Sequence, residues 1–216
     1  MHTRKFVTGI VAVLATLAVF SGNALSAPED DYKTGAASFV LGDFVGAMPM
    51  LRKSAEAGYA PAQAMYGQLL LGTAQEEEAV KFFKKSADQK NIEGQFYYGT
   101  SLLTGEGTKK IPEEGIKWIL LSAEQGLKDA ENQMALIAAA PLYSSILSDA
   151  EAQRWLKKSA DNEFLPAIVH LVVAYRTGTN GFVVDNKIAD EYQAKANKIQ
   201  GINDTDTKRK RRGAKK

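Results

Sequence analysis

The chain has 216 residues, of which 45% are apolar and 24% are charged, and it contains no cysteine. This balance is typical of a globular protein with a continuous core, and the lack of cysteine excludes disulfides, thiolate nucleophiles and thiol-bound metals. Nine of the 27 Lys and Arg lie in the first five or the last nine residues, so 18 remain against 25 Asp and Glu. A net charge of +2 therefore hides an acidic body with a basic tail.

The first segment is typical of a secretory signal. Arg4 and Lys5 precede an uncharged apolar run at 6–20, and small residues follow. A bilayer-spanning helix needs roughly 20 apolar residues, so the short run favours a cleaved signal over the alternative of an uncleaved anchor. We predict that residues 1–26 are removed by cleavage after Ser26 and that the protein is periplasmic or secreted.

A repeat with spacings of 32, 36, 37 and 37 residues runs through the rest of the chain. A serine, replaced by alanine in a weak fifth copy, marks it at Ser54, Ser86, Ser122, Ser159 and Ala196. A fixed period in the thirties is typical of stacked helical pairs. We predict an all-α fold, a right-handed α-solenoid of about five antiparallel helix pairs. It covers residues 27–200 and is followed by a disordered basic tail at 201–216.

The first pair is expected to open near Asp31. Its second helix, at 44–57, has one stripe of small and apolar residues at helical spacing, and Gly58 supplies a left-handed end. We expect this stripe to be buried, and it consists of Ala47, Leu51, Ser54 and Ala55.

The second and third pairs repeat this plan. A helix at 62–72 precedes one that begins at 76–78, where acidic side chains favour the positive end of the helix dipole. The third pair opens at Gly94, and Pro112 begins its second helix. The shorter spacing of 32 residues indicates a connector that is four residues shorter in the second pair than in the third.

The last two pairs have longer connectors. The fourth opens at Ala130 and has an irregular connector at 141–147, after which Ser148 caps the helix that contains Trp155. The fifth opens at Ala167, turns at 177–181, and continues in a helix that carries Tyr192. Beyond Lys198 the periodicity fades.

Together these residues resemble the Sel-1-like repeats, a branch of the tetratricopeptide-like superhelices, over about residues 32–198. The matching positions are Ala62, Gly67, Gln95, Gly99, Gly105, Gly107, Trp118, Ala123, Gly126, Ala130, Trp155, Ala160, Ala167, Tyr175 and Gly178. The resemblance implies extracytoplasmic binding roles, such as periplasmic restraint of sensor kinases or neutralisation of secreted phospholipases. It brings no catalytic residue. The paired cysteines of one extracellular branch are missing, so the activity proposed for that branch is not carried over.

Side chains that suggest chemistry have plainer interpretations. The Lys-Ser dipeptide of the K-S-A motif occurs three times at a small-residue position, which favours packing over a serine-lysine nucleophile pair. Trp118 and Trp155 recur at the inter-helix position and are expected in the core. His170 is the only histidine after the signal, and we interpret it as a partly buried packing residue, with pH sensing as the alternative. We therefore predict no enzyme activity, cofactor or metal.

The candidate binding surface lies on the first helices of the pairs. Those of the last two pairs are apolar nearly all round, which is typical of a helix buried on every side or of one that offers an apolar face to a partner. The repeat register points eight side chains toward the concave face, namely Gln68, Phe96, Thr100, Leu103, Asn132, Leu136, Val173 and Arg176. The tail adds a basic cluster of Lys208, Arg209, Lys210, Arg211 and Arg212.

These features predict an exported protein-interaction scaffold, an adaptor or inhibitor that binds a partner protein on its concave face. One alternative is an immunity protein for a secreted phospholipase. A hydrolase of cell-wall or lactam substrates is disfavoured because no nucleophile and base pair up, and a purely structural envelope protein would have no saturable partner. For the tail, an anionic surface is the predicted contact, with a merely solvated terminus as the alternative, since a secretory signal makes nucleic acid an unlikely partner.

Overall fold

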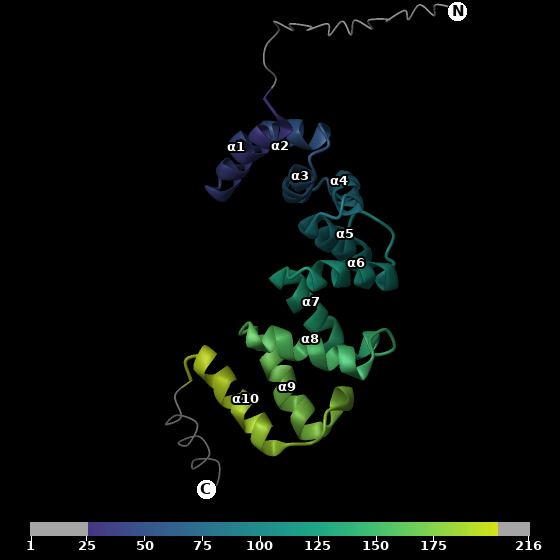
Figure 1. The fold of residues 1–216 in the computed structure, drawn as a ribbon, viewed down its shortest axis with the longest axis vertical. Helices are drawn as coiled ribbons and strands as arrows, with labels where there is room; N and C mark the ends of the chain where they lie inside the picture. The colour runs from purple at the N-terminus through teal and green to yellow at the C-terminus, as the bar shows by residue number, and fades with distance from the viewer. Residues whose placement is uncertain (1–25, 203–216) are drawn as a thin grey trace, which may run out of the picture.

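The structure is a computed structural model that describes residues 26–202, and these residues form ten α-helices. Figure 1 shows them following one another in pairs along the longest axis of the molecule. Their bounds are α1 (Pro28–Val40), α2 (Phe44–Glu56), α3 (Ala60–Gly72), α4 (Glu76–Asp88), α5 (Ile92–Thr104), α6 (Pro112–Glu124), α7 (Lys128–Ala139), α8 (Asp149–Asp161), α9 (Leu165–Thr177) and α10 (Asn186–Ile199). Two short 3-10 helices, η1 (Pro141–Tyr143) and η2 (Thr179–Gly181), lie in connectors. The predicted all-α solenoid of five helix pairs is confirmed.

Connector lengths account for the uneven repeat spacing. Three residues, 73–75, join α3 to α4, whereas seven residues, 105–111, join α5 to α6. The difference of four residues is the one that the sequence predicts. Longer connectors at 140–148 and 178–185 give the last two pairs their wider spacing.

Most predicted helix ends are confirmed. Gly58 has a φ of 93° after α2, Pro112 is the first residue of α6, and Ser148 forms a capping box with Glu151 at the start of α8. The start of the first pair is wrong, because α1 begins at Pro28 rather than near Asp31. A proline at the first helical position costs no hydrogen bond, and the acidic residues of the next turn favour the same start.

Glycines let the two helices of a pair approach closely in the N-terminal part. The eighth residue of α1, α3 and α5 is Gly35, Gly67 and Gly99, respectively. A Cβ atom at Gly99 would lie 2.7 Å from the carbonyl oxygen of Gly115 on α6, and one at Gly67 would lie 2.4 Å from the Phe83 ring. These pairs therefore require glycine at the contact.

The repeated serine joins the two helices of its pair. Ser54, Ser86 and Ser122 are fully buried, and each hydroxyl donates to the backbone carbonyl of the first residue of the preceding odd-numbered helix. The oxygen–oxygen distances are 2.5, 2.7 and 2.8 Å. In the fourth pair, Ser159 donates to the side chain of Asn132 instead. The predicted packing role of the serine is confirmed.

The core runs through all five pairs. The predicted buried stripe of α2 is confirmed, with Ala47 and Leu51 at 0% exposure. Trp155 is also fully buried and lies under the guanidinium of Arg154. Trp118 is only partly buried and packs edge-on against Tyr98, so the expected core position holds fully for one tryptophan and partly for the other.

Within residues 26–202, no helix combines the length and apolar character that crossing a membrane requires. The predicted signal, apart from Ser26, and the basic tail from residue 203 onward lie outside the described residues.

Candidate protein-binding surface

The first helices of the pairs line the inner side of the stack. Contacts join α1 to α3, α3 to α5 and α7 to α9, whereas the second helices of successive pairs contact one another less. Because successive helix pairs approach more closely on the side of their first helices, the stack curves toward that side. The ten helices follow an arc (Figure 1). We call the surface formed by the side chains of the first helices that are not packed against second helices the concave side.

Five of the eight predicted binding residues lie on this side. Gln68 and Val173 are the ninth residues of α3 and α9, and each lines a hollow between first helices. Thr100 and Leu136 share that ninth position on α5 and α7, and Phe96 lies one turn before Thr100. Leu136 and Val173 are 41% and 47% exposed, whereas Gln68, Phe96 and Thr100 are partly buried.

Leu103 is a correction. It is only 6% exposed and packs in the core with Ile116 and Ile119 of α6. The cause is Gly115, where a Cβ atom would lie 2.7 Å from the backbone nitrogen of Leu103. Because Gly115 has no side chain, α6 approaches α5 closely enough to cover Leu103.

Asn132 and Arg176 are bonded within their own helix pairs. The Asn132 side chain accepts the hydroxyl of Ser159. The Arg176 guanidinium forms an ion pair of 3.2 Å with Asp190 on α10. Each of the two side chains therefore already has one contact to the second helix of its own pair.

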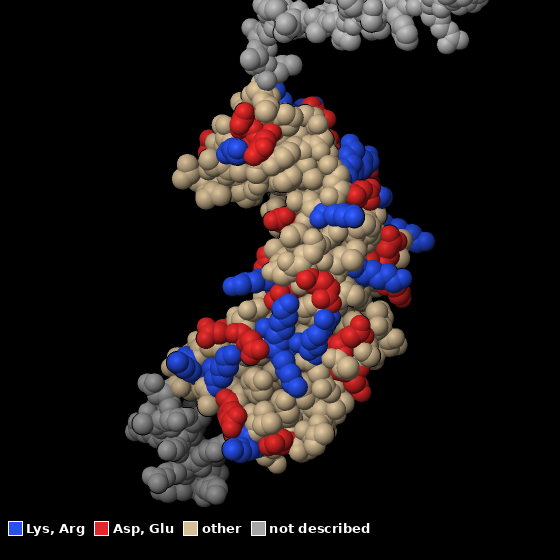
Figure 2. Space-filling model, viewed as in Figure 1, with Lys and Arg blue, Asp and Glu red and all other residues tan. Residues whose placement is uncertain are grey.

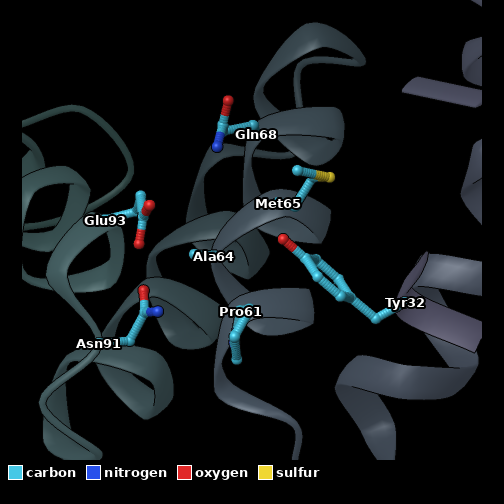
Figure 3. A pocket seen from close by; sticks show the side chains of 7 residues that line it. All are labelled: Tyr32, Pro61, Ala64, Met65, Gln68, Asn91 and Glu93. Atoms are coloured by element: carbon cyan, nitrogen blue, oxygen red, sulfur yellow. The ribbon is translucent and has the colours of Figure 1, made fainter. Parts of the chain in front are cut away.

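The N-terminal half of the concave side contains a hollow of about 200 Å³ between α1, α3 and the start of α5. Its lining consists of Tyr32, Pro61, Ala64, Met65, Gln68, Asn91 and Glu93. Figure 3 shows the Tyr32 hydroxyl reaching from α1 toward Met65, with Gln68 above and Glu93 and Asn91 on the opposite side. We call this the tyrosine hollow.

The tyrosine hollow contains one charged side chain, the carboxylate of Glu93. Burial raises the pKa of the Tyr32 hydroxyl, and the nearby negative charge of Glu93 raises it further. Burial likewise raises the pKa of Tyr97 on α5, with added effects from the carboxylates of Asp129 and Glu93. The ion pairs formed within residues 26–202 leave Glu93 and Asp129 without a cation.

The C-terminal half contains a second hollow, of about 290 Å³, between α7, α9 and η2. Its lining consists of Ala138, Ala139, Ala140, Pro141, Ser144, His170, Val173, Thr179 and Asn180. Asn180 bonds His170 Nε2 at 2.9 Å through its Oδ1 and donates from Nδ2 to the Ala138 carbonyl at 3.0 Å. The histidine is partly buried and held by this bond, as the packing interpretation predicted. We call this the alanine hollow.

The Lys-Ser dipeptides are not arranged as reacting pairs. Ser86 is buried against the backbone of α3, whereas Lys85 is exposed and lies over the Phe82 ring at 5.0 Å. Lys158 reaches Glu131 of the neighbouring helix at 3.0 Å, away from Ser159. In the described part of the chain, no three or more His, Asp and Glu gather in a way that could hold a metal ion.

The sequence reasoning missed Tyr32, Met65 and Glu93. Tyr32 is the fifth residue of α1, and a helix expected to open near Asp31 leaves it in the first turn. Met65 and Glu93 are the sixth and second residues of their helices, whereas the candidates that the repeat register predicts are fifth, ninth and twelfth residues. The row of carboxylates at Glu29, Glu93 and Asp129, each the second residue of a first helix, was the available signal.

Comparison with known proteins supports the helical repeat that the sequence and the structure show. The Sel1 repeat model matches residues 60–91, 92–127 and 147–164. A protective antigen of uropathogenic Escherichia coli with an SLR fold aligns with 79% of this chain and 38% of its own length, at 23% identity and a TM-score of 0.70. This chain therefore spans well under half of that protein.

Two further solved structures are similar over most of both chains. A Sel1 repeat protein from Oxalobacter formigenes aligns with 80% of this chain and 73% of its own, at 22% identity and a TM-score of 0.63. A chain described as a sel1 repeat protein from Klebsiella pneumoniae aligns with 81% and 88%, at 18% identity and a TM-score of 0.56. At these identities the likeness shows the fold.

Stacked helical pairs with a curved inner surface define a helical-repeat scaffold, a class of protein that presents an extended concave surface for binding. Within that class, three segments of the chain match the Sel1 repeat model, and the fold is the one found in solved Sel1 repeat proteins.

Proposed function

We propose that this Sel1 repeat scaffold is an exported adaptor or inhibitor that binds a partner protein on its concave side, without chemistry of its own. The observation that carries the proposal is a group of exposed aliphatic side chains on α7 and α9. Leu136, Val169 and Val173 are 41%, 44% and 47% exposed, and Val173 lines the alanine hollow. Burying such side chains is favourable by roughly 25 cal/mol for each Å² removed from water.

The alanine hollow suits an apolar side chain of the partner. Two of its polar side chains, His170 and Asn180, already bond each other, and Asn180 also bonds a backbone carbonyl. Covering His170 Nε2 and the Asn180 amide therefore leaves neither group unsatisfied, which would otherwise cost about 1–3 kcal/mol. The hydroxyls of Ser144 and Thr179 also line the hollow. The helices that carry the surface are held by the core, so little ordering entropy is lost on docking.

Partner capture from the protein's own envelope fraction tests the proposal. We expect Leu136→Asp combined with Val173→Asp to abolish capture while the helical content and melting temperature stay near those of the unchanged protein. Val183→Asp is the matched control, because Val183 is 83% exposed in the connector before α10, outside the concave side. Undiminished capture by the folded double variant would disprove binding at this surface.

A further inference from the structure

The tyrosine hollow has the chemistry of a site for a basic side chain. An aromatic ring, a carboxylate and an amide, those of Tyr32, Glu93 and Gln68, converge on a space of about 200 Å³ (Figure 3). A guanidinium or ammonium group is attracted both to an aromatic face and to a carboxylate, and an amide oxygen can accept its remaining N–H. Met65 and Pro61 offer apolar contact for the aliphatic stem of the same side chain.

The distribution of charge over the solenoid leaves this side short of cations. Of the 18 Lys and Arg in residues 26–202, 12 lie on second helices and three on first helices. On the face shown in Figure 2, basic side chains gather over α8, which is a second helix. Two of the three first-helix cations already have partners, since Lys33 pairs with Glu29 and Arg176 with Asp190. The third, Lys128, forms no ion pair within the described residues, and neither do Glu93 and Asp129, so both carboxylates can attract a cation from another molecule.

The chain itself carries a segment of the matching charge. Residues 208–216 contain seven Lys and Arg, while residues 26–202 contain 23 Asp and Glu against 18 Lys and Arg. We propose that the basic segment 208–216 of one copy docks in the tyrosine hollow of a second copy, with an arginine or lysine side chain against Tyr32 and Glu93.

Docking between copies follows from the positions of the two ends. The hollow is formed by α1, α3 and α5, whereas the basic segment follows α10 at the opposite end of the long axis (Figure 1). Lys208 and Lys216 are six and 14 residues beyond Ile202, so they reach at most about 20 and 50 Å from it when the chain is fully extended. A head-to-tail contact of this kind uses two different surfaces and extends to further copies unless a ring closes.

A peptide with the sequence of residues 203–216 and a fluorescent label is the direct probe. We expect saturable binding to the purified protein at low salt, measured by fluorescence anisotropy, and its loss at about 0.5 M salt. Glu93→Gln should weaken binding about tenfold or more, as expected for losing a charge-assisted hydrogen bond. Glu113→Gln, which changes the second residue of α6 in the same way, is the matched control and should bind normally.

Sedimentation of the whole protein provides the second readout. We expect concentration-dependent association at low salt that disappears on deletion of residues 203–216 and with Glu93→Gln, and that persists with Glu113→Gln. The proposal is overturned if the peptide binds equally to the Glu93→Gln protein, or only to vesicles of anionic lipid. It is also overturned if deleting the tail strengthens peptide binding in a protein that stays monomeric, since the tail would then occupy its own hollow.

Docking of the basic segment between copies does not require the proposed partner protein. It concerns the other half of the concave side and is measured with the purified protein alone. Loss of partner capture with normal self-association, or the reverse, would separate the two ideas.

Discussion

The two halves of the concave side use the same helix positions for different chemistry. The sixth and ninth residues of a first helix are Met65 and Gln68 in the N-terminal half, and His170 and Val173 in the C-terminal half. The N-terminal hollow leaves the Glu93 carboxylate without an ion pair, whereas the C-terminal hollow joins His170 to Asn180 and exposes the aliphatic side chain of Val173. The repeat therefore constrains the packed positions and leaves the concave positions to differ between copies.

The packed positions also change between the halves. The eighth residue of a first helix is glycine in α1, α3 and α5, alanine at Ala135 in α7, and valine at Val172 in α9. The buried fourth residue is Gln95 in α5, where it bonds Gln125, and Glu131 in α7, where it bonds Asn162 and Lys158. Mutations at matched positions can therefore show whether the two halves are stabilised independently.

The largest effect is expected in the C-terminal half. Trp155→Ala removes a fully buried ring and should lower the free energy of unfolding by about 3–5 kcal/mol, measured by urea denaturation. Because each pair contacts only its neighbours, hydrogen exchange should show lost protection in α7 to α10 before α1 to α4. Trp118→Ala, at a partly buried ring, should cost less. A Trp155→Ala stability near that of the unchanged protein would contradict the core role.

A smaller effect on stability is expected at the close glycine contact between α5 and α6. Gly99→Ala places a Cβ atom 2.7 Å from the carbonyl oxygen of Gly115 and 2.9 Å from the backbone nitrogen of Ile119. Backbone atoms cannot rotate away as a side chain can. We therefore expect overpacking to lower the free energy of unfolding by about 1–3 kcal/mol. Thermal melts monitored by circular dichroism would measure it.

The matched change in the C-terminal half removes a methyl group instead of adding one. Ala135→Gly, at the same eighth position of α7, should cost roughly 1 kcal/mol through helix propensity, since glycine is the poorer helix former. If Gly99→Ala instead stabilised the protein, α5 and α6 could separate without penalty, and the glycine contact would not explain the burial of Leu103.

The sequence predicted the features that repeat and missed those that depend on contacts between helices. The serine spacing and the four-residue difference between connectors predicted the helix pairs, because packed small residues must recur at one register. Leu103 was misplaced because its burial depends on Gly115, a residue on another helix. The tyrosine hollow was missed because it combines residues of three helices, and no single copy of the repeat contains Tyr32, Gln68 and Glu93.

The smallest expected effect lies at the N-terminal end and depends on pH. Hydrogen bonds from Lys53 and from the Ser26 hydroxyl lower the pKa of Asp31, the fourth residue of α1. The pKa in the folded state is then below the unfolded value, so the interaction stabilises the fold above the unfolded pKa of about 3.9. The stabilisation is lost as the pH falls through the folded-state pKa.

Asp31→Asn should therefore lower the urea midpoint slightly at neutral pH, and the difference from the unchanged protein should close as the pH is lowered below about 4. Asp30→Asn is the control, because Asp30 lies in the same first turn but forms no ion pair within the described residues. The Lys53 bond of 2.9 Å does not require Ser26, so Lys53→Met should give the same pH dependence even if processing removes that serine. A difference that persists unchanged in acid would mean that Asp31 acts through packing rather than through its charge.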